Sequence, residues 1–234
     1  MKVTLIVPTL NEIAGMKEIM PRIKQDWYDQ LIILDGGSTD GTVEYAQQQD
    51  YLLVSQKERG MRYAYMEVLP YVEGDVIVTF SPDGNSIPEL IPTLIETMKE
   101  GYDMVIASRY AGSARSYDDD LITAFGNKMY NWLVNLFFRA RYSDVMVIFR
   151  AYKKELIKLL DLERDLGYSL GEKIFQTRIS WELLLSIRCA KKRLRVIEIP
   201  GDEPPRIGGE RKLHVIRWGG AYLIQVLREV FAWR

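Results

Sequence analysis

The feature that most constrains this chain is an apolar, β-branched run that ends in a polar turn. Residues 76–80 read Val-Ile-Val-Thr-Phe, and residues 81–85 read Ser-Pro-Asp-Gly-Asn. A continuous apolar run predicts a strand that is covered on both faces, as in parallel sheets. The turn would then place the Asp83 carboxylate at the carboxyl end of a strand, which is where open α/β folds bind their ligands.

Similar runs alternate with helical segments through the first half of the chain. We expect strands at Val3–Val7, Leu31–Leu34, Tyr51–Ser55, Val76–Phe80 and Asp103–Ser108. This alternation predicts an α/β fold, with a mostly parallel sheet, right-handed crossovers and flanking helices.

The second half of the chain is less regular. We expect helices at Asn127–Phe138 and Glu172–Lys191, strands at Val145–Phe149 and Leu194–Ile199, and a closing amphipathic helix at Val215–Trp233. That last helix and the aromatic helix before Arg139 combine apolar side chains with arginine. They could pack on the core, on a partner such as a second copy in a homodimer, or on a membrane surface.

Composition narrows the class of protein. The chain has 31 Lys and Arg against 32 Asp and Glu, which argues against general nucleic-acid binding. The single cysteine, Cys189, cannot form an internal disulfide and indicates a reducing compartment. We find no signal peptide, and no window reaches the roughly 18 uninterrupted apolar residues of a membrane span. We therefore expect a cytoplasmic protein, with a peripheral position on the inner face of a membrane left open.

Polar residues follow the first two strands. After the first, Pro8, Thr9 and Glu12 could bracket a flat base and accept its imino N–H, although Asn11 alone would suffice as a helix cap. After the second, Asp35 could accept from a base or a ribose hydroxyl, and the glycines that follow allow close backbone approach. The alternative at this second position is an ordinary capped turn.

Charged residues follow the third and fourth strands. Lys57 and Arg62 could face a diphosphate, or they could belong to a solvated charge cluster. Asp83 and Asn85 offer the hard oxygen ligands that a divalent cation on a diphosphate requires.

As an ordered set, these motifs resemble glycosyltransferase family 2 enzymes with the GT-A fold, in the branch that is similar to dolichol-phosphate mannose synthase. The resemblance runs over nearly the whole chain in the family's order. The segments that carry it are Val7–Glu12, Leu34–Thr42, Ser81–Asn85, Ala107–Tyr110, Asp144–Tyr152, Trp181–Leu184, Glu198–Pro200 and Gly208–Leu213.

The resemblance implies an enzyme of glycan or glycolipid biosynthesis. It would be an inverting glycosyltransferase that moves a sugar from a nucleotide-diphosphate donor to a polyprenyl phosphate, or to a hydroxyl of a glycan or lipid. We expect one domain over residues 1–234: a nucleotide-sugar-binding half at 1–110, an acceptor half at 111–214, and the amphipathic helix at 215–234.

The resemblance also implies roles for individual residues. The donor would contact Pro8, Thr9, Asn11, Glu12, Asp35, Gly37, Lys57, Arg62, Ser81 and Asp83. Mg²⁺ or Mn²⁺ would be held by Asp83, Asn85 and His214. The acceptor would contact Arg109, Arg206 and Lys212, and the candidate catalytic residues are Asp83, Asp120 and Arg109.

Three departures from the family pattern affect these expectations. Ser81 stands where the family has a metal-binding aspartate. Asp120 stands where the lipid-phosphate enzymes have an arginine, so it would repel a phosphate, could serve as a base toward a hydroxyl, or belongs to a solvated acidic loop. Gly36 stands where the family has the second aspartate of its nucleoside motif. Apart from these departures, His214 could instead be a surface or helix-start residue.

Two other functions stay open. A non-catalytic nucleotide-sugar-binding module is compatible with Ser81. A sugar-nucleotide pyrophosphorylase would require a Gly-rich basic loop after the first strand, which residues 8–12 lack.

Overall fold

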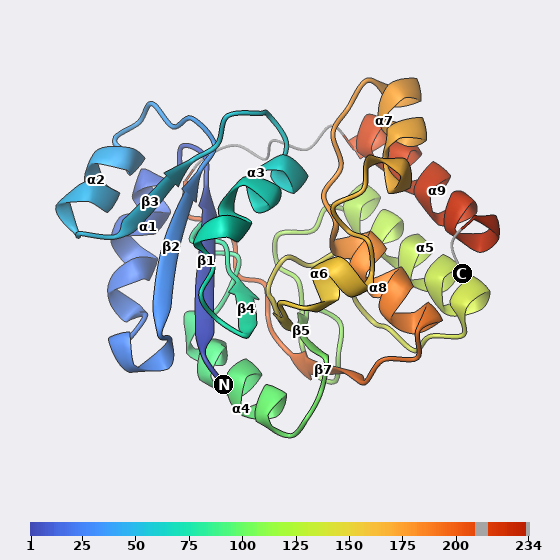
Figure 1. Ribbon diagram of the computed structural model, residues 1–234, viewed down its shortest axis with the longest axis horizontal. Helices are drawn as coiled ribbons and strands as arrows, with labels where there is room; N and C mark the ends of the chain where they lie inside the picture. The colour runs from blue at the N-terminus through green and yellow to red at the C-terminus, as the bar shows by residue number, and fades with distance from the viewer. Residues whose placement is uncertain (209–214, 233–234) are drawn as a thin grey trace.

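A computed structural model describes residues 1–208 and 215–232. Within these residues, seven strands form one sheet in the order β3-β2-β1-β4-β6-β5-β7 (Figure 1). The strands are β1 (Val3–Thr9), β2 (Gln30–Asp35), β3 (Leu52–Ser55), β4 (Val76–Thr79), β5 (Met104–Ser108), β6 (Arg150–Lys153) and β7 (Val196–Pro200). Only β6 runs against its neighbours β4 and β5. The expected α/β fold with a mostly parallel sheet is therefore confirmed.

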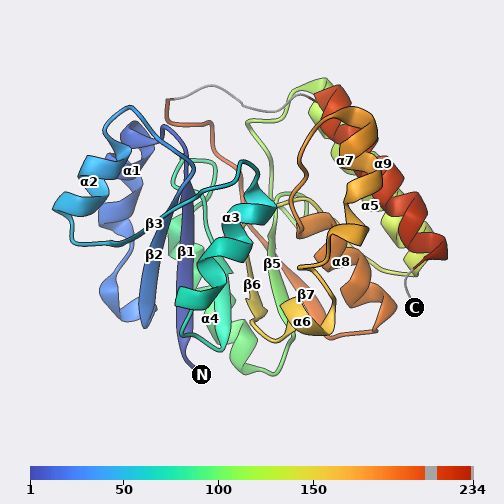
Figure 2. The same cartoon turned by 45° about the horizontal axis from the view of Figure 1, so that its top comes forward.

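Helices connect the strands and cover the sheet. They are α1 (Ile13–Ile19), α2 (Thr42–Gln48), α3 (Met61–Val68), α4 (Ile91–Lys99), α5 (Leu121–Phe138), α6 (Leu156–Leu159), α7 (Ser169–Phe175), α8 (Glu182–Lys191) and α9 (Val215–Phe231). A short 3₁₀ turn, η5 (Asp165–Gly167), precedes α7. Figures 1 and 2 both show α5, α7, α8 and α9 gathered at the end of the molecule away from α1 and α2.

Strand register assembles the polar strand ends at one edge of the sheet. Every residue of β1 and β4 is buried, as their continuous apolar runs predict. Thr9 pairs with Asp35, and Asp35 pairs with Ser55. Because β4 and β5 run in the same direction as β1, the turn after β4 and Arg109 after β5 reach this same edge.

The prediction of a strand at Val145–Phe149 is wrong, because these residues form a largely buried loop before β6. Their apolar side chains are needed by the core, and several of their backbone groups bond to side chains. Phe149 is tied to the sheet through its carbonyl, which accepts from the N–H of Ala107 in β5 at 3.0 Å. Asp144 accepts from the N–H groups of Met146 and Val147. The buried guanidinium of Arg150 donates to the carbonyls of Val145 and Val147. These contacts provide hydrogen-bond partners for backbone N–H and C=O groups of the loop, which would otherwise be buried at a cost in free energy.

The prediction of a single helix at Glu172–Lys191 is also wrong, because the segment forms two helices. Helix α7 ends at Phe175 and helix α8 begins at Glu182. Gln176 adopts a left-handed conformation that ends α7. The helix expected from Asn127 instead begins at Leu121, where the Asp120 side chain caps it by accepting from the N–H of Thr123 at 2.7 Å.

Candidate functional site

The turn after β4 holds the Asp83 carboxylate at the carboxyl edge of the sheet. Asp83 is buried, and its Oδ1 accepts from the N–H of Asn85 at 3.0 Å. Helix α1 packs so closely that a Cβ on Gly15 would lie 2.1 Å from the Pro82 carbonyl oxygen. The N–H of Ile207 donates to the Asp83 carbonyl at 2.8 Å. The turn is therefore fixed by both α1 and the segment that follows β7.

Arg206 places a positive charge between two acids that come from different strand ends. Its Nη1 lies 2.9 Å from Asp83 Oδ2 and 3.5 Å from Glu12 Oε1. Both acids are buried and the arginine is half-buried, so the contact is only partly screened by water. Arg206 was expected to face an acceptor, whereas the structure sets it on two residues that were expected to bind the donor and its metal.

Asn85 and an acid from a distant loop meet beside this turn. The Asn85 side-chain amide donates to Asp118 Oδ2 at 3.2 Å. The Asn85 Oδ1 atom is buried and accepts no hydrogen bond from the described part of the chain. A buried carbonyl oxygen without a donor is costly unless a ligand completes it. Asp118 was not among the expected site residues.

The turn fits a divalent cation only in part. Asp83 and Asn85 supply a carboxylate and a carbonyl oxygen, which are the donors that Mg²⁺ and Mn²⁺ prefer. Among residues 1–208 and 215–232, no group of three acidic, histidine or cysteine side chains could hold a metal by itself. Ser81 lies half-buried at the start of the turn. A cation here would therefore need ligands beyond Asp83 and Asn85.

The loops after β1 and β2 are tied to each other. The Asp35 carboxylate accepts from the hydroxyls of Thr9 and Ser38 and from the N–H groups of Gly37 and Ser38. Asn11 donates its N–H to the Ser38 hydroxyl at 2.8 Å and accepts from the N–H of Thr39 at 2.8 Å. These bonds are all within the protein, so the direct contacts of Asp35 and Asn11 with a nucleoside stay predictions. Pro8 lies near the end of β1, and Gly37 lies on the loop after β2.

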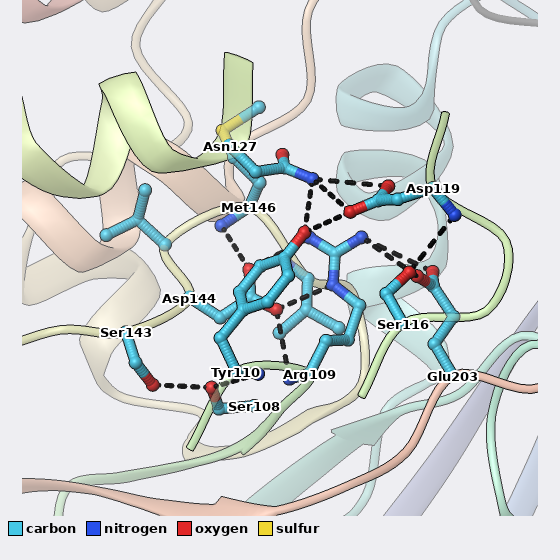
Figure 3. Close-up of polar contacts among 12 residues, drawn as sticks. Ser108, Arg109, Tyr110, Ser116, Asp119, Asn127, Ser143, Asp144, Met146 and Glu203 are labelled. Atoms are coloured by element: carbon cyan, nitrogen blue, oxygen red, sulfur yellow. Dashed lines mark hydrogen bonds and ion pairs between the residues drawn. The ribbon is translucent and has the colours of Figure 1, made fainter. Parts of the chain in front are cut away.

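Arg109 lies in a buried ion-pair cluster at the end of β5 (Figure 3). Its guanidinium binds Asp144 at two points, 2.6 and 3.0 Å, and its Nη1 lies 3.3 Å from Glu203. Burial opposes the charge of Arg109, but Asp144 more than compensates, so the pKa of the guanidinium lies well above its usual range. Burial raises the pKa of Glu203 although Arg109 opposes the shift. Arg109 joins three segments of the fold, and its expected contact with an acceptor stays a prediction.

Among the described residues, the three consecutive aspartates, Asp118 to Asp120, have different hydrogen-bond partners. Asp118 reaches Asn85. Asp119 accepts from the Tyr110 hydroxyl and from the side-chain amide of Asn127 (Figure 3). Asp120, the expected general base, caps α5 instead. The aspartate that the fold brings to the Asp83 turn is thus Asp118 and not Asp120.

Arg62 does not lie at the strand ends where a diphosphate was expected. Its guanidinium is buried, pairs with Asp165 at 2.6 Å and Glu172 at 3.2 Å, and stacks on Tyr168. The predicted contact with the donor is therefore not supported by this position. Lys57 is exposed on the loop after β3. Lys212 and His214 lie outside the described residues.

The family model described as "Glycosyl transferase family 2" matches residues 4–160. The chain belongs to glycosyl transferase family 2. The matched family 2 region contains β1 to α6, together with the Asp83 turn and Arg109. The family and the enzyme class, glycosyltransferase, are as the sequence motifs predicted, and Arg206 lies beyond the matched region.

Several curated family 2 proteins are similar to this chain. Glycosyltransferase AglJ of Haloferax volcanii is 24% identical over 97% of this chain and 71% of its own length. Dolichol-phosphate mannosyltransferase of Pyrococcus furiosus is 28% identical over 99% of this chain and 63% of its own length. Undecaprenyl-phosphate 4-deoxy-4-formamido-L-arabinose transferase of Shewanella sediminis is 26% identical over 68% of this chain and half its own length. The chain thus spans only part of these relatives.

Among solved structures, glucosyl-3-phosphoglycerate synthase from Mycobacterium tuberculosis, crystallised with Mn²⁺, UDP and glucosyl-3-phosphoglycerate, resembles this chain. The TM-score is 0.63 at 18% identity, over 98% of this chain and 79% of the synthase. At this identity the likeness establishes the fold, and the GT-A class expected for this family 2 chain is confirmed.

Proposed function

We propose that this family 2 glycosyltransferase transfers a sugar from a nucleoside-diphosphate donor to a polyprenyl phosphate, with inversion at the sugar carbon. The observation that carries the proposal is the pair of acids, Glu12 and Asp83, that two parallel strands bring to one cation at the carboxyl edge. This edge is the ligand-binding edge of open α/β sheets. Two of the relatives described above carry a polyprenyl-phosphate substrate in their names.

The donor half of the site would be built from the loops after β1, β2 and β4. The tied loops at Asn11 and Asp35 would bracket the nucleoside, and the diphosphate would lie toward Asp83. Mg²⁺ or Mn²⁺, held by Asp83 and Asn85, would supply positive charge for the departing nucleoside diphosphate. The Asn85 carbonyl oxygen, which lacks a hydrogen-bond donor among the described residues, supports this assignment.

The position of Asp120 supports a phosphate acceptor over a hydroxyl. A hydroxyl nucleophile needs a base to remove its proton, and the expected base caps α5. A phosphate oxygen is already ionised near neutral pH, because its second pKa is about 6, and needs no base. Arg206, which already bridges two acids, is the cation best placed to meet the incoming phosphates.

Donor binding and transfer can be tested on the whole chain. Thermal unfolding with UDP-, GDP- and dTDP-sugars, with and without Mn²⁺, identifies the donor, since a ligand at 100 times its Kd stabilises by about 2.7 kcal/mol. Transfer of radiolabelled sugar to a polyprenyl phosphate then tests the acceptor. We expect Asp83→Asn to lower transfer at least about 100-fold, and the exposed Asp26→Asn to leave it unchanged.

Three results would contradict the proposal. If none of the sugar nucleotides stabilised the protein, the proposed nucleotide-sugar donor would be wrong. Binding of a sugar nucleotide without sugar transfer would favour the non-catalytic binding module. Transfer to a glycan hydroxyl, with no transfer to the polyprenyl phosphate, would show that the proposed acceptor is wrong. The proposed donor would be unaffected by that result.

A further inference from the structure

Helix α5 exposes large apolar side chains on its outward side and buries two polar ones beside Tyr130 and Val134 on its inward side. Its outward side chains include Leu121, Phe125 and Trp132, which are 91%, 70% and 61% exposed. Its inward side carries Asn127 and Asn131, which are 8% and 9% exposed. A surface helix of a globular protein normally buries its apolar stripe and exposes its polar one. The outward side of α5 is therefore suited to an apolar environment.

The segment η5–α7 and helix α9 likewise expose large apolar side chains. Outward from η5 and α7 lie Leu166, Leu170 and Ile174, four residues apart, whereas Glu172 is buried. Outward from α9 lie Leu223, Leu227 and Phe231, again four residues apart, whereas Gln225 and Glu229 are buried. Exposed large apolar residues are normal when single and informative when contiguous.

These elements are neighbours in the fold. The Tyr130 hydroxyl of α5 donates to the Gly219 carbonyl of α9. Gly171 of α7 packs so tightly on α9 that a Cβ there would lie 2.6 Å from the Ala221 carbonyl oxygen. Both ribbon views show α5, α7 and α9 together at one end of the molecule (Figures 1 and 2). We call the exposed apolar side chains of α5, η5–α7 and α9 the apolar face.

The exposed charges within these segments and just after α5 are mostly basic, whereas Asp118 to Asp120 and Glu163 are acids that precede α5 and η5. On α5, η5–α7, α9 and the residues just after α5, the exposed basic side chains are Lys128, Arg139, Arg141, Lys173 and Arg217. The acids of these segments are Asp165, Glu172 and Glu229. Each of them lies in an ion pair, the first two with Arg62 and the third with Arg188. This local excess of positive charge contrasts with the net charge of -1 for the whole chain.

We propose that the apolar face docks on the surface of a lipid bilayer that contains anionic headgroups. Apolar side chains would enter the boundary between headgroups and acyl chains, and the basic side chains would contact the headgroups. None of the helices in residues 1–208 and 215–232 is long and apolar enough to cross a membrane, so the contact is peripheral for this part of the chain.

The charges favour lipid over a second copy of the chain. A two-fold interface places the same patch on both subunits. Two apolar faces in contact would set basic side chains against basic side chains, because the acids of these segments are already held in ion pairs. An anionic lipid surface complements both the apolar stripes and the basic side chains.

Vesicle flotation of the full chain tests the proposal without any sugar substrate. We expect binding to phosphatidylcholine vesicles that contain about one quarter phosphatidylglycerol to exceed binding to pure phosphatidylcholine at least about tenfold. The triple variant Phe125→Ser, Trp132→Ser, Leu136→Ser should lose at least about tenfold in binding to the anionic vesicles. The matched control Leu52→Ser, Tyr71→Ser changes two exposed apolar residues elsewhere and should bind like the wild type.

Circular dichroism would establish that each variant is folded. In addition, brominated lipid should quench the fluorescence of the wild type more than that of Trp132→Phe, which keeps the helix intact. Equal binding by the triple variant and the wild type would overturn the proposal, as would no binding to either vesicle. Sedimentation tests the alternative of a second copy. If the wild type formed a concentration-dependent dimer, the triple variant did not, and neither bound vesicles, the apolar face would be a dimer interface instead.

Discussion

At the scale of single residues, Arg206 has the most direct consequence for metal binding. Its guanidinium occupies Asp83 Oδ2, the same carboxylate that would bind a divalent cation. A cation must therefore compete with Arg206. We expect Arg206→Gln to bind Mn²⁺ about fivefold more tightly without nucleotide, a gain of ~1 kcal/mol. Titration of free Mn²⁺ by electron paramagnetic resonance measures this directly.

The matched control is Arg22→Gln, which removes an exposed arginine–glutamate pair with Glu89. It should leave Mn²⁺ affinity unchanged. If Arg206→Gln binds Mn²⁺ no better than the wild type, the two cations do not share the Asp83 carboxylate.

Arg109 is expected to matter for folding. Its replacement by methionine would leave Asp144, which is fully buried, without its bidentate partner. Removing one member of a buried ion pair typically costs 3–5 kcal/mol, so we expect Arg109→Met to lose about 4 kcal/mol of unfolding free energy. Urea denaturation measures the loss. A loss of less than about 1 kcal/mol, like that of a surface pair, would mean that Asp144 finds another partner.

Residue identities alone could not separate these roles. The motif order correctly marked the segments that hold Asp83, Asp35 and Arg109, but Arg62 and Arg206 look alike in sequence. Arg62 is buried because Glu172, far along the chain, meets it. Arg206 reaches Asp83 because the segment after β7 bonds to the turn after β4. Such long-range pairings depend on the folded chain.

At the scale of elements, the start of α5 separates two roles for Asp120. Asparagine caps a helix as well as aspartate does but cannot act as a base. We therefore expect Asp120→Asn to retain both stability and transfer activity, whereas Asp120→Ala should lose about 1 kcal/mol of stability. Steady-state kinetics with thermal unfolding would check both. If a stable Asp120→Asn turned over at least about 100-fold more slowly, the usual contribution of a base, the general-base role would be restored.

Asp103 makes the strands around β5 sensitive to acid. It accepts from Lys153 Nζ at 2.6 Å, at the end of β6, and from the N–H of Arg195 at 2.8 Å, just before β7. Burial opposes its charge, but these bonds prevail and the pKa of Asp103 lies below its usual value of 3.8. A lowered pKa in the folded state contributes stability above pH 3.8 that is lost as the pH falls through the folded value.

We expect Asp103→Asn to lower the unfolding free energy at pH 7 by ~1 kcal/mol. The difference from the wild type should shrink as the pH falls below about 4. Urea denaturation at several pH values measures it. A difference that stays constant down to about pH 3 would show that the ionised form of Asp103 is not what stabilises the strands.

Elements with simple periodicity were predictable and the others were not. β1, β4 and β5 were found because strands buried on both faces read as apolar runs. The run at 145–149 has the same appearance, but Asp144 and Arg150 bond its backbone as a loop. The first turn of α5 was missed because its exposed Leu121, Ile122 and Phe125 give no signal of a water-facing helix.

At the scale of the whole molecule, the order of strands and helices along the chain predicted the fold class. Strands that alternate with helices leave few topologies for a parallel sheet. The reversal of β6 could not be predicted, because it is set by pairing with β4 and β5, which lie on either side of it. The resemblance to family 2 enzymes supplied the GT-A class that alternation alone leaves open.

The hydrogen bonds that join the loops after β1 and β2 affect how fast a ligand can bind. Asn11, Asp35 and Ser38 hold these loops together. The entropy of ordering them is lost once, when the chain folds, and not at each encounter. Association of a sugar nucleotide should then be a single kinetic phase whose rate rises linearly with concentration, with no slow isomerisation before or after the encounter.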